Sequence, residues 1–344
     1  MLPTMTIAGR RIGANEPPLV VAEVGINHEG SVDKACQMID AAASVGCECV
    51  KFQCHIIDDE MIPNCVIPGN ATESIWEIMA RCSLTEVEER LLKQRCEAQG
   101  MIFLSTPFSR AAADRLEAMG VAAYKIGSGE CNNYPLIEHI ASFQKPIILS
   151  TGMNDLVSIQ PAIDILRRRH VPFGLLHCTS IYPTPYEKIR LGALRTLQEA
   201  FPDAVIGLSD HSVSIFPCLG AVAHGAAILE RHFTADKRWS GPDIPISMDP
   251  DELRQLITGS RIIHQTLGGT KSILDEEAPT IRFAYASVVA VRDIEQGEIL
   301  TRDNLWLKRP GTGELRAIDF AQCLGRRARS ELKKNHQVRW DDLE

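Results

Sequence analysis

The feature that most constrains the fold of this chain is a series of short apolar runs, each rich in β-branched residues. Eight runs occur, at residues 19–26, 47–53, 101–106, 122–126, 146–150, 173–178, 205–209 and 228–233. Amphipathic stretches separate them, for example 32–45, 86–99 and 156–169. Short apolar runs of this kind predict buried strands, and strands that alternate with helices form parallel sheets.

Eight strand and helix units within about 250 residues match the size of a closed barrel. We therefore expect a (β/α)8 TIM barrel over residues 1–267, with a doubly wound open sheet as the structural alternative. The run GGTKSILDEEAPT predicts a linker at 268–281. Short strand and turn patterns in residues 282–344 predict a small second domain.

Composition limits the class of protein. Of 344 residues, 45% are hydrophobic and 23% charged, as in ordinary soluble domains. The 36 Lys and Arg against 44 Asp and Glu give a net charge of -8, which argues against nucleic acid or an anionic membrane as partner. The sequence shows neither a long apolar run nor a secretory signal pattern, so we expect no membrane segment and a cytoplasmic protein. Eleven cysteines without a CxxC pair predict reduced thiols.

Polar side chains stand at the carboxyl end of each predicted strand. In a barrel these ends share one open face, so the side chains converge on one site. Lys and Glu inside apolar strands are costly to bury unless they are paired or ligated. The segments that carry them are AEVGINHEG, KFQCH, FLSTPFS, YKIGSGE, LSTGMN, HCTSIYPTPY, GLSDHS and ILERHF.

Two lysines in these segments, Lys51 and Lys125, predict an anion site. With the hydroxyls of Thr106 and Ser128 they are suited to hold a phosphate or a carboxylate. Two alternatives stay open. Each lysine can form a structural ion pair with a neighbouring Glu, or one of them can form a Schiff base with a carbonyl substrate if burial lowers its pKa.

Two histidines, His211 and His232, end the last two predicted strands. Imidazoles on neighbouring strands can ligate one divalent cation, with Glu23, Asp210 or water completing the shell. A hydrogen-bonded structural role is the alternative for each. Further groups able to act as general bases or to orient water are the carboxylates of Glu23, Glu130, Glu230 and Asp243.

Taken together, these motifs resemble those of sialic acid synthases. They include AEVGINHEG, KFQCH, IPGNA, FLSTPFSRAAADRL, YKIGSGECNNYPLI, ILSTGMN, YPTPYE, IGLSDHS, ILERHFT, GPDIPISMDP and NLWLKRPGTG, spread from residue 19 to about 313. Members of that family condense phosphoenolpyruvate with an open-chain 2-acetamido sugar, giving a nine-carbon 2-keto acid and inorganic phosphate. The resemblance implies a TIM barrel followed by an antifreeze-like (SAF) domain, in a domain-swapped homodimer.

The resemblance also implies roles for single residues. Phosphoenolpyruvate would be bound by Lys51, Thr106, Lys125, Ser128, Ser150, Tyr182 and Ser209. Ser180 stands where the compared synthases have Asn, so we expect its shorter side chain to reach this substrate through water. The metal, Mn2+ rather than Mg2+ or Co2+, would be bound by His211 and His232. The sugar would contact Gln53, Asn70, Tyr182, Asp243 and, from the other subunit, Arg309 with Phe283 nearby.

As catalytic groups the resemblance implies Glu23 for activating water, Glu130 for proton handling, and Lys51 and Lys125 for the leaving phosphate. We expect a metal-dependent condensation of phosphoenolpyruvate with N-acetylmannosamine to give N-acetylneuraminate. The first alternative is a legionaminic acid synthase that uses 2,4-diacetamido-2,4,6-trideoxymannose, a sugar that differs only at C4 and C6. Two more functions stay open, a Schiff-base aldolase or lyase and a catalytically silent sugar-binding module.

Overall fold

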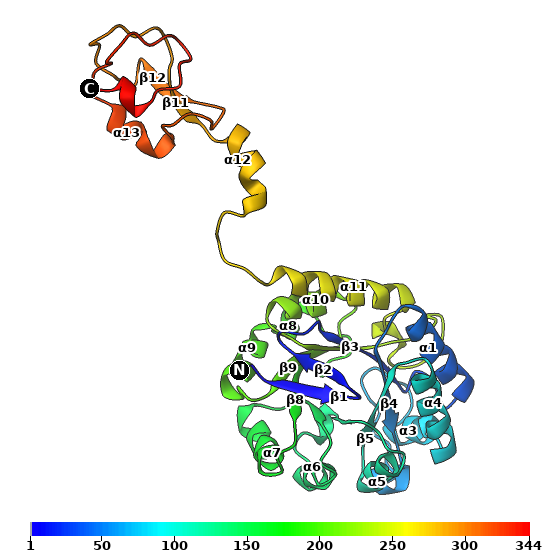
Figure 1. The fold of residues 1–344 in the computed structure, drawn as a ribbon. Helices are drawn as coiled ribbons and strands as arrows, with labels where there is room; N and C mark the ends of the chain where they lie inside the picture. The colour runs from blue at the N-terminus through cyan, green and yellow to red at the C-terminus, as the bar shows by residue number, and fades with distance from the viewer. Residues whose placement is uncertain (1) are drawn as a thin grey trace. The chain divides into compact units, whose positions relative to one another are not determined.

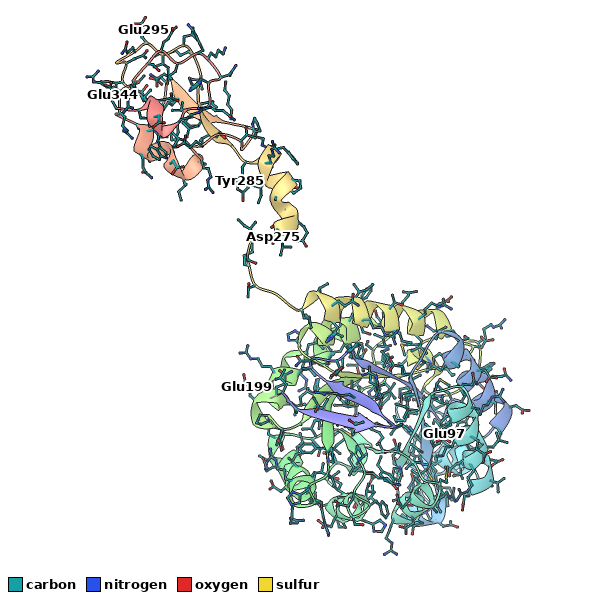
Figure 2. The ribbon with its side chains drawn as sticks, in the orientation of Figure 1. Glu97, Glu199, Asp275, Tyr285, Glu295 and Glu344 are labelled. Atoms are coloured by element: carbon teal, nitrogen blue, oxygen red, sulfur yellow. The ribbon has the colours of Figure 1, made fainter. Side chains whose placement is uncertain are left out.

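The computed structural model describes residues 2–344, which form two compact units, one ending at Gly268 and the other spanning Gly269–Glu344 (Figure 1). Figure 2 shows the side chains that fill the inside of the first unit. Within the described residues, no helix has the length and apolar character needed to cross a membrane.

The first unit is built on eight parallel strands. They are β3 (Leu19–Gly25), β4 (Cys49–Cys54), β5 (Ile102–Pro107), β6 (Tyr124–Ile126), β7 (Ile147–Ser150), β8 (Phe173–Cys178), β9 (Val205–Asp210) and β10 (Ile228–His232). Their order in the sheet is β5-β4-β3-β10-β9-β8-β7-β6, and the end strands β5 and β6 are neighbours in space. Chain order therefore runs once around a nearly closed ring, which confirms the TIM barrel and excludes the doubly wound sheet.

Helices cover the outside of the barrel (Figure 1). The longer ones are α1 (Val32–Ser44), α3 (Ile75–Cys82), α4 (Glu86–Ala98), α5 (Arg110–Ala118), α6 (Tyr134–Ala141), α7 (Leu156–Arg168), α9 (Gly192–Ala200), α10 (Phe216–Ala223) and α11 (Pro250–Thr266). Several begin at a residue whose side chain accepts a hydrogen bond from a first-turn backbone N–H, such as Ser31, Asp155 and Asp249. These caps satisfy donors that would otherwise be unpaired, so they define where the helices start. The short helices α2 (Ile57–Glu60) and α8 (Tyr186–Ile189) lie in connecting segments.

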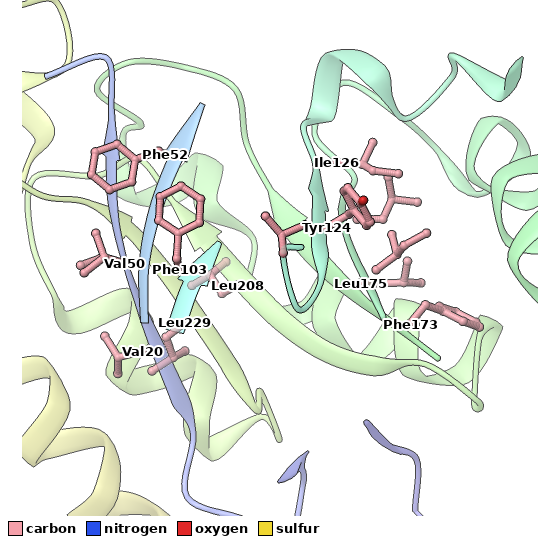
Figure 3. Close-up of a cluster of buried hydrophobic side chains, with 14 of the residues drawn as sticks. Val20, Val50, Phe52, Phe103, Tyr124, Ile126, Phe173, Leu175, Leu208 and Leu229 are labelled. Atoms are coloured by element: carbon pink, nitrogen blue, oxygen red, sulfur yellow. The ribbon is translucent and has the colours of Figure 1, made fainter. Parts of the chain in front are cut away.

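Outward-facing strand residues form the main core. Alternate side chains of each strand pack under the helices, as Figure 3 shows for Val20, Val50, Phe52, Phe103, Tyr124, Ile126, Phe173, Leu175, Leu208 and Leu229. Because side chains alternate across a strand, the residues between them point into the barrel. One face of each strand therefore packs against the helices, and the other face points into the barrel interior.

A second apolar cluster fills the amino end of the barrel interior. It contains Leu19, Cys49 and Ile228 from the strands, together with Met5 and Ile12. The last two belong to an antiparallel hairpin of β1 (Thr4–Ile7) and β2 (Arg10–Gly13). Fully burying such a side chain contributes about 1.5–3 kcal/mol. The hairpin therefore closes this end of the barrel and leaves the carboxyl end for chemistry.

The second unit has its own core. Val288 of β11 (Ser287–Ala290) and Leu305 of β12 (Leu305–Lys308) pack with Leu315, Leu332 and Leu343. The two strands are antiparallel, and the helices of this unit are α12 (Ala278–Ala284) and α13 (Phe320–Cys323).

Candidate active site

The period of two along the barrel strands places a polar layer directly above the apolar one. Glu23 follows the inward-facing Val21 on β3, and Lys51 follows Cys49 on β4 in the same way. The layer lines a cavity of about 320 Å³ at the carboxyl end of the barrel. Of the predicted site residues, those that line it are Glu23, Lys51, Gln53, Thr106, Lys125, Ser128, Ser150, Ser180, Tyr182, Ser209, His211, Glu230 and His232.

Two lysines and two carboxylates form one buried network in this cavity. The Nζ atom of Lys51 lies 2.8 Å from Oε2 of Glu23 and 3.6 Å from Oε1 of Glu230. The Nζ atom of Lys125 lies 3.4 Å from the same Glu230 oxygen. All four side chains are almost completely buried. The ion pairs expected as an alternative are therefore present, and they line an open cavity.

The network sets the two lysines apart. Burial acts to lower the pKa of Lys51, but Glu23 and Glu230 outweigh it and raise that pKa above its usual value. Burial lowers the pKa of Lys125, which has a single carboxylate in contact. Burial raises the pKa of Glu23, whereas Lys125 and Lys51 overcome burial and lower the pKa of Glu230. Lys51 is thus a fixed cation, and Lys125 is the lysine that a Schiff base would need.

Hydroxyl groups surround the lysines. Thr106 Oγ1 accepts a hydrogen bond from Lys51 Nζ at 3.2 Å, and Ser209 Oγ lies 3.5 Å from Oε1 of Glu230. Ser128 Oγ accepts a hydrogen bond from the backbone N–H of Gly152 at 3.0 Å. Within residues 2–344, the buried hydroxyl of Ser150 has no hydrogen-bond partner. A buried group without a partner is costly, so Ser150 is suited to bind a ligand.

The two histidines lie side by side, with ring centroids 5.5 Å apart. His211 is held by Tyr182, whose ring stacks on it at 4.2 Å, and by the carbonyl of Thr179, 3.0 Å from Nδ1. His232 Nδ1 is buried without a hydrogen-bond partner in the described chain and lies 3.7 Å from Oδ2 of Asp243. Burial, followed by the charge of His211, lowers the pKa of His232 well below its usual value.

This pair fits a divalent cation in part. His232 is a neutral imidazole with an unused nitrogen, which makes it a good metal ligand. The carbonyl of Thr179 orients the ring of His211. Burial acts to lower the pKa of His211, but Cys178 outweighs burial and raises that pKa, so this ring would release its proton when a metal binds. The described residues contain no group of three or more His, Cys, Asp or Glu side chains arranged to hold a metal. The protein therefore offers two imidazoles, and substrate or water would supply the remaining ligands.

A second cavity of about 340 Å³ adjoins the first. The two share Gln53, Tyr182 and His232 in their walls, and the second adds Asn70 and Asp243. Nδ2 of Asn70 donates to Oδ1 of Asp243 at 3.4 Å. Burial raises the pKa of Asp243 to about 6. Four of the residues expected to bind the sugar, Gln53, Asn70, Tyr182 and Asp243, thus meet in a compartment beside the lysines.

Gly25 permits the close approach of the Glu23 and Gln53 side chains. It follows Glu23 at an irregular point of β3 and has a φ of +54°, in the left-handed region that favours glycine. A Cβ atom there would lie 3.2 Å from Oε1 of Glu23 and 3.4 Å from Nε2 of Gln53. Gln53 Nε2 donates to that Glu23 oxygen at 3.0 Å, so the glycine leaves room for the contact that orients Glu23.

Three predicted residues lie elsewhere. Glu130 does not line either of these cavities, and its carboxylate accepts a hydrogen bond from Nδ2 of Asn133 at 2.6 Å. Phe283 in α12 and Arg309 after β12 belong to the second unit, where both are exposed. Their contact with the sugar of another subunit, and the proton handling by Glu130, stay predictions.

Other cavity residues were not predicted. Phe108 lines both cavities, and Met153 and Cys178 line the first. Cys178 could have been found from the alternation of β8, because Leu176 points inward two residues earlier. Phe108 and Met153 lie in loops, where no periodic signal exists.

A barrel with buried lysines, carboxylates and paired histidines at the carboxyl ends of its strands is the architecture of a TIM-barrel enzyme. A model of the NeuB family matches residues 38–272, and a model of the SAF domain matches residues 285–344. The chain therefore belongs to the NeuB family of sialic (nonulosonic) acid synthases, and its second domain is an SAF domain.

Similar proteins agree with this assignment. An N,N'-diacetyllegionaminic acid synthase from Campylobacter jejuni is 36% identical over 93% of this chain and 98% of its own length. Human N-acetylneuraminate-9-phosphate synthase is 33% identical over 87% of this chain and 85% of its own. The crystal structure of an N-acetylneuraminic acid synthetase from Leptospira borgpetersenii, in complex with citrate, aligns with a TM-score of 0.75 at 33% identity, covering 82% of this chain and 96% of that one.

Proposed function

We propose that the protein condenses phosphoenolpyruvate with N-acetylmannosamine and releases N-acetylneuraminate and inorganic phosphate. The observation that carries the proposal is the pair of adjoining cavities. One contains Lys51 and Lys125, which suit the phosphate and carboxylate of phosphoenolpyruvate. The other contains Asn70 and Asp243, which suit the hydroxyl and amide groups of a sugar.

In this proposal the adjoining cavities hold C3 of phosphoenolpyruvate next to C1 of the open-chain sugar. Holding two reactants in place removes much of the entropic barrier to forming the carbon–carbon bond. Positive charge then develops at C2 of phosphoenolpyruvate, where water adds. Glu23 accepts the proton of that water, since burial raises its pKa and Gln53 orients its carboxylate. The alkoxide that the new bond leaves at C1 of the sugar takes up a proton and becomes a hydroxyl. Phosphate leaves by C–O cleavage while Lys51 and Lys125 hold its charge.

We propose that a divalent metal, Mn2+ before Mg2+ or Co2+, completes the site. When bound, such an ion supplies Lewis-acid polarisation of the sugar aldehyde. His211 and His232 would hold it, because each has an imidazole nitrogen that the protein does not use.

A specific observation favours a second sugar. The second cavity has an apolar wall that includes Ile26, Ile75 and Ile78, and such a wall suits the methyl group of 2,4-diacetamido-2,4,6-trideoxymannose. The similarity to a legionaminic acid synthase points the same way. This sugar is the alternative substrate.

We also propose a cytoplasmic homodimer in which Arg309 of one chain contacts the sugar held by the other. Support comes from the resemblance, and from Arg309 being an exposed cation on a domain with its own core.

The test offers each sugar separately, with phosphoenolpyruvate and Mn2+, and measures phosphate release and product mass. We expect release that needs both the sugar and the metal, with N-acetylmannosamine preferred. A tenfold preference for the diacetamido sugar would replace the first substrate with the second. Full turnover in the presence of EDTA, together with covalent trapping of the sugar by borohydride, would support the Schiff-base mechanism instead.

A further inference from the structure

A further cavity, of about 640 Å³, lies outside the barrel. Its walls come from the start of α7, the loop before that helix, the end of β8 and the first turns of α9. A volume of this size accommodates a sugar-sized molecule. Neither the condensation nor the metal site described above uses it.

Two side chains in the wall have unused binding capacity. His177 is 95% buried, since its exposed fraction is 5%, and its one hydrogen bond within the described chain joins Nε2 to the carbonyl of Ile189 at 2.6 Å. Burial lowers the pKa of His177, so the ring is neutral, Nε2 carries the proton, and Nδ1 is a free acceptor. Arg190 is exposed, and no ion pair of the described residues involves it.

These groups define the chemistry of a ligand. Arg190 is suited to a carboxylate or a phosphate, and His177 Nδ1 can accept a hydrogen bond from a hydroxyl group. Thr196 on α9 and Asp155 at the start of α7 add a hydroxyl and a carboxylate to the same wall. We propose that this cavity binds a small polyhydroxylated anion, such as a sugar acid or a sugar phosphate, and thereby regulates the neighbouring active site.

A thin wall connects the cavity to the active site. Met153 and Cys178 line both cavities. Beside Met153, Gly152 donates its N–H to Ser128 Oγ, and Asn154 Nδ2 donates to the Ser128 carbonyl at 3.2 Å. A Cβ atom on Gly152 would lie 2.5 Å from Ser180 Oγ and 2.8 Å from Ser128 Oγ, so this loop has no room to move inward without narrowing the active-site cavity.

The sign of the coupling follows from that contact. A ligand that presses on the loop pushes it toward Ser128 and Ser180, where phosphoenolpyruvate is proposed to bind. We therefore expect ligand and phosphoenolpyruvate to weaken each other's binding by the same factor, about fivefold or more. This coupling rests on the proposed function, whereas binding to the outer cavity does not.

Calorimetric titration of the full chain tests the proposal. N-acetylneuraminate and N-acetylglucosamine 6-phosphate are the probes, each titrated separately, in the presence of EDTA and without the sugar substrate. At saturating phosphoenolpyruvate the active site is occupied, and we expect at least one probe still to bind. Arg190→Gln and Thr196→Val should each weaken that binding tenfold or more. Arg195→Gln is the matched control, because Arg195 lies on the same helix but outside this cavity, and it should change nothing.

Coupling between two sites weakens probe binding by a fixed factor, whereas competition for one site weakens it without limit. A probe dissociation constant that keeps rising in proportion to the phosphoenolpyruvate concentration would therefore show a single shared site and overturn the proposal. Equal probe affinity in the native protein and Arg190→Gln would overturn it as well. If the native protein does not bind phosphoenolpyruvate, the proposed function fails, but comparing the native protein with Arg190→Gln in its absence still decides whether the outer cavity binds an anion.

Discussion

Replacing Lys125 by Met tests the buried charge network through protein stability. The network contains two cations and two anions, and the substitution leaves Glu23 and Glu230 facing Lys51 alone. Removing one partner of a buried ion pair costs about 3–5 kcal/mol. Because Lys51 still lies 3.6 Å from Glu230, we expect the lower end, about 3 kcal/mol of the free energy of unfolding.

The matched control is Lys93→Met. Lys93, which is half-buried, pairs with the exposed Glu97 one turn along α4, and an i,i+4 helix pair of this type contributes about 0.3–0.5 kcal/mol. Urea unfolding followed by circular dichroism measures both variants. Adding Glu230→Gln to Lys125→Met restores a neutral network and should recover about 1 kcal/mol or more. A loss for Lys125→Met no larger than that for Lys93→Met, or strictly additive losses in the double variant, would refute the reasoning.

Three further predictions concern packing, thiol exposure and the second domain. A Cβ atom on Gly207 would overlap the carbonyl of Ile228 and the side chain of Leu176. Gly207→Ala should therefore lower the free energy of unfolding by about 1–3 kcal/mol. Gly192 has open space around it at the start of α9, so Gly192→Ala should not lower the free energy of unfolding. Of the eleven thiols only Cys65 is exposed. A disulfide reagent should therefore react fast with one thiol in the native protein and with eleven thiols after denaturation. Fast reaction of several thiols in the native protein would contradict the fold. Arg309→Ala should raise the KM for the sugar about 10–100-fold, as expected for loss of a charged hydrogen bond, with little change for phosphoenolpyruvate. A larger rise in the KM for phosphoenolpyruvate than in the KM for the sugar would exclude the proposed contact of Arg309 with the sugar.

The barrel and most of its site follow from periodicity. Strand residues such as Glu23 and Lys51 stand two positions after apolar inward-facing ones, so alternation alone predicts that they share the interior. The amino-terminal hairpin was not predicted, because its strands have only four residues each and the second of them, RRIG, does not alternate.

The pairing of charged side chains and the geometry of the loops could not be predicted from the sequence. Which lysine contacts which carboxylate depends on strand register, so the contact of Glu230 with both Lys51 and Lys125 became visible only in the structure. Glu130 was predicted to belong to the site, but the local turn places it outside. It follows the carboxyl end of a strand, but a 3-10 turn at Ser128–Glu130 holds it beside Asn133 and away from the two adjoining cavities.

The most direct measurement is the affinity for phosphoenolpyruvate, by calorimetry without the sugar, of the native protein, Lys93→Met and the double variant Lys125→Met/Glu230→Gln. Removing a buried charged contact costs about 2 kcal/mol or more, which corresponds to a dissociation constant raised about 30-fold. We expect that increase in the double variant, whose network is again neutral, and native affinity in Lys93→Met. Equal binding by all three proteins would mean that phosphoenolpyruvate does not bind in the cavity between Lys51 and Lys125.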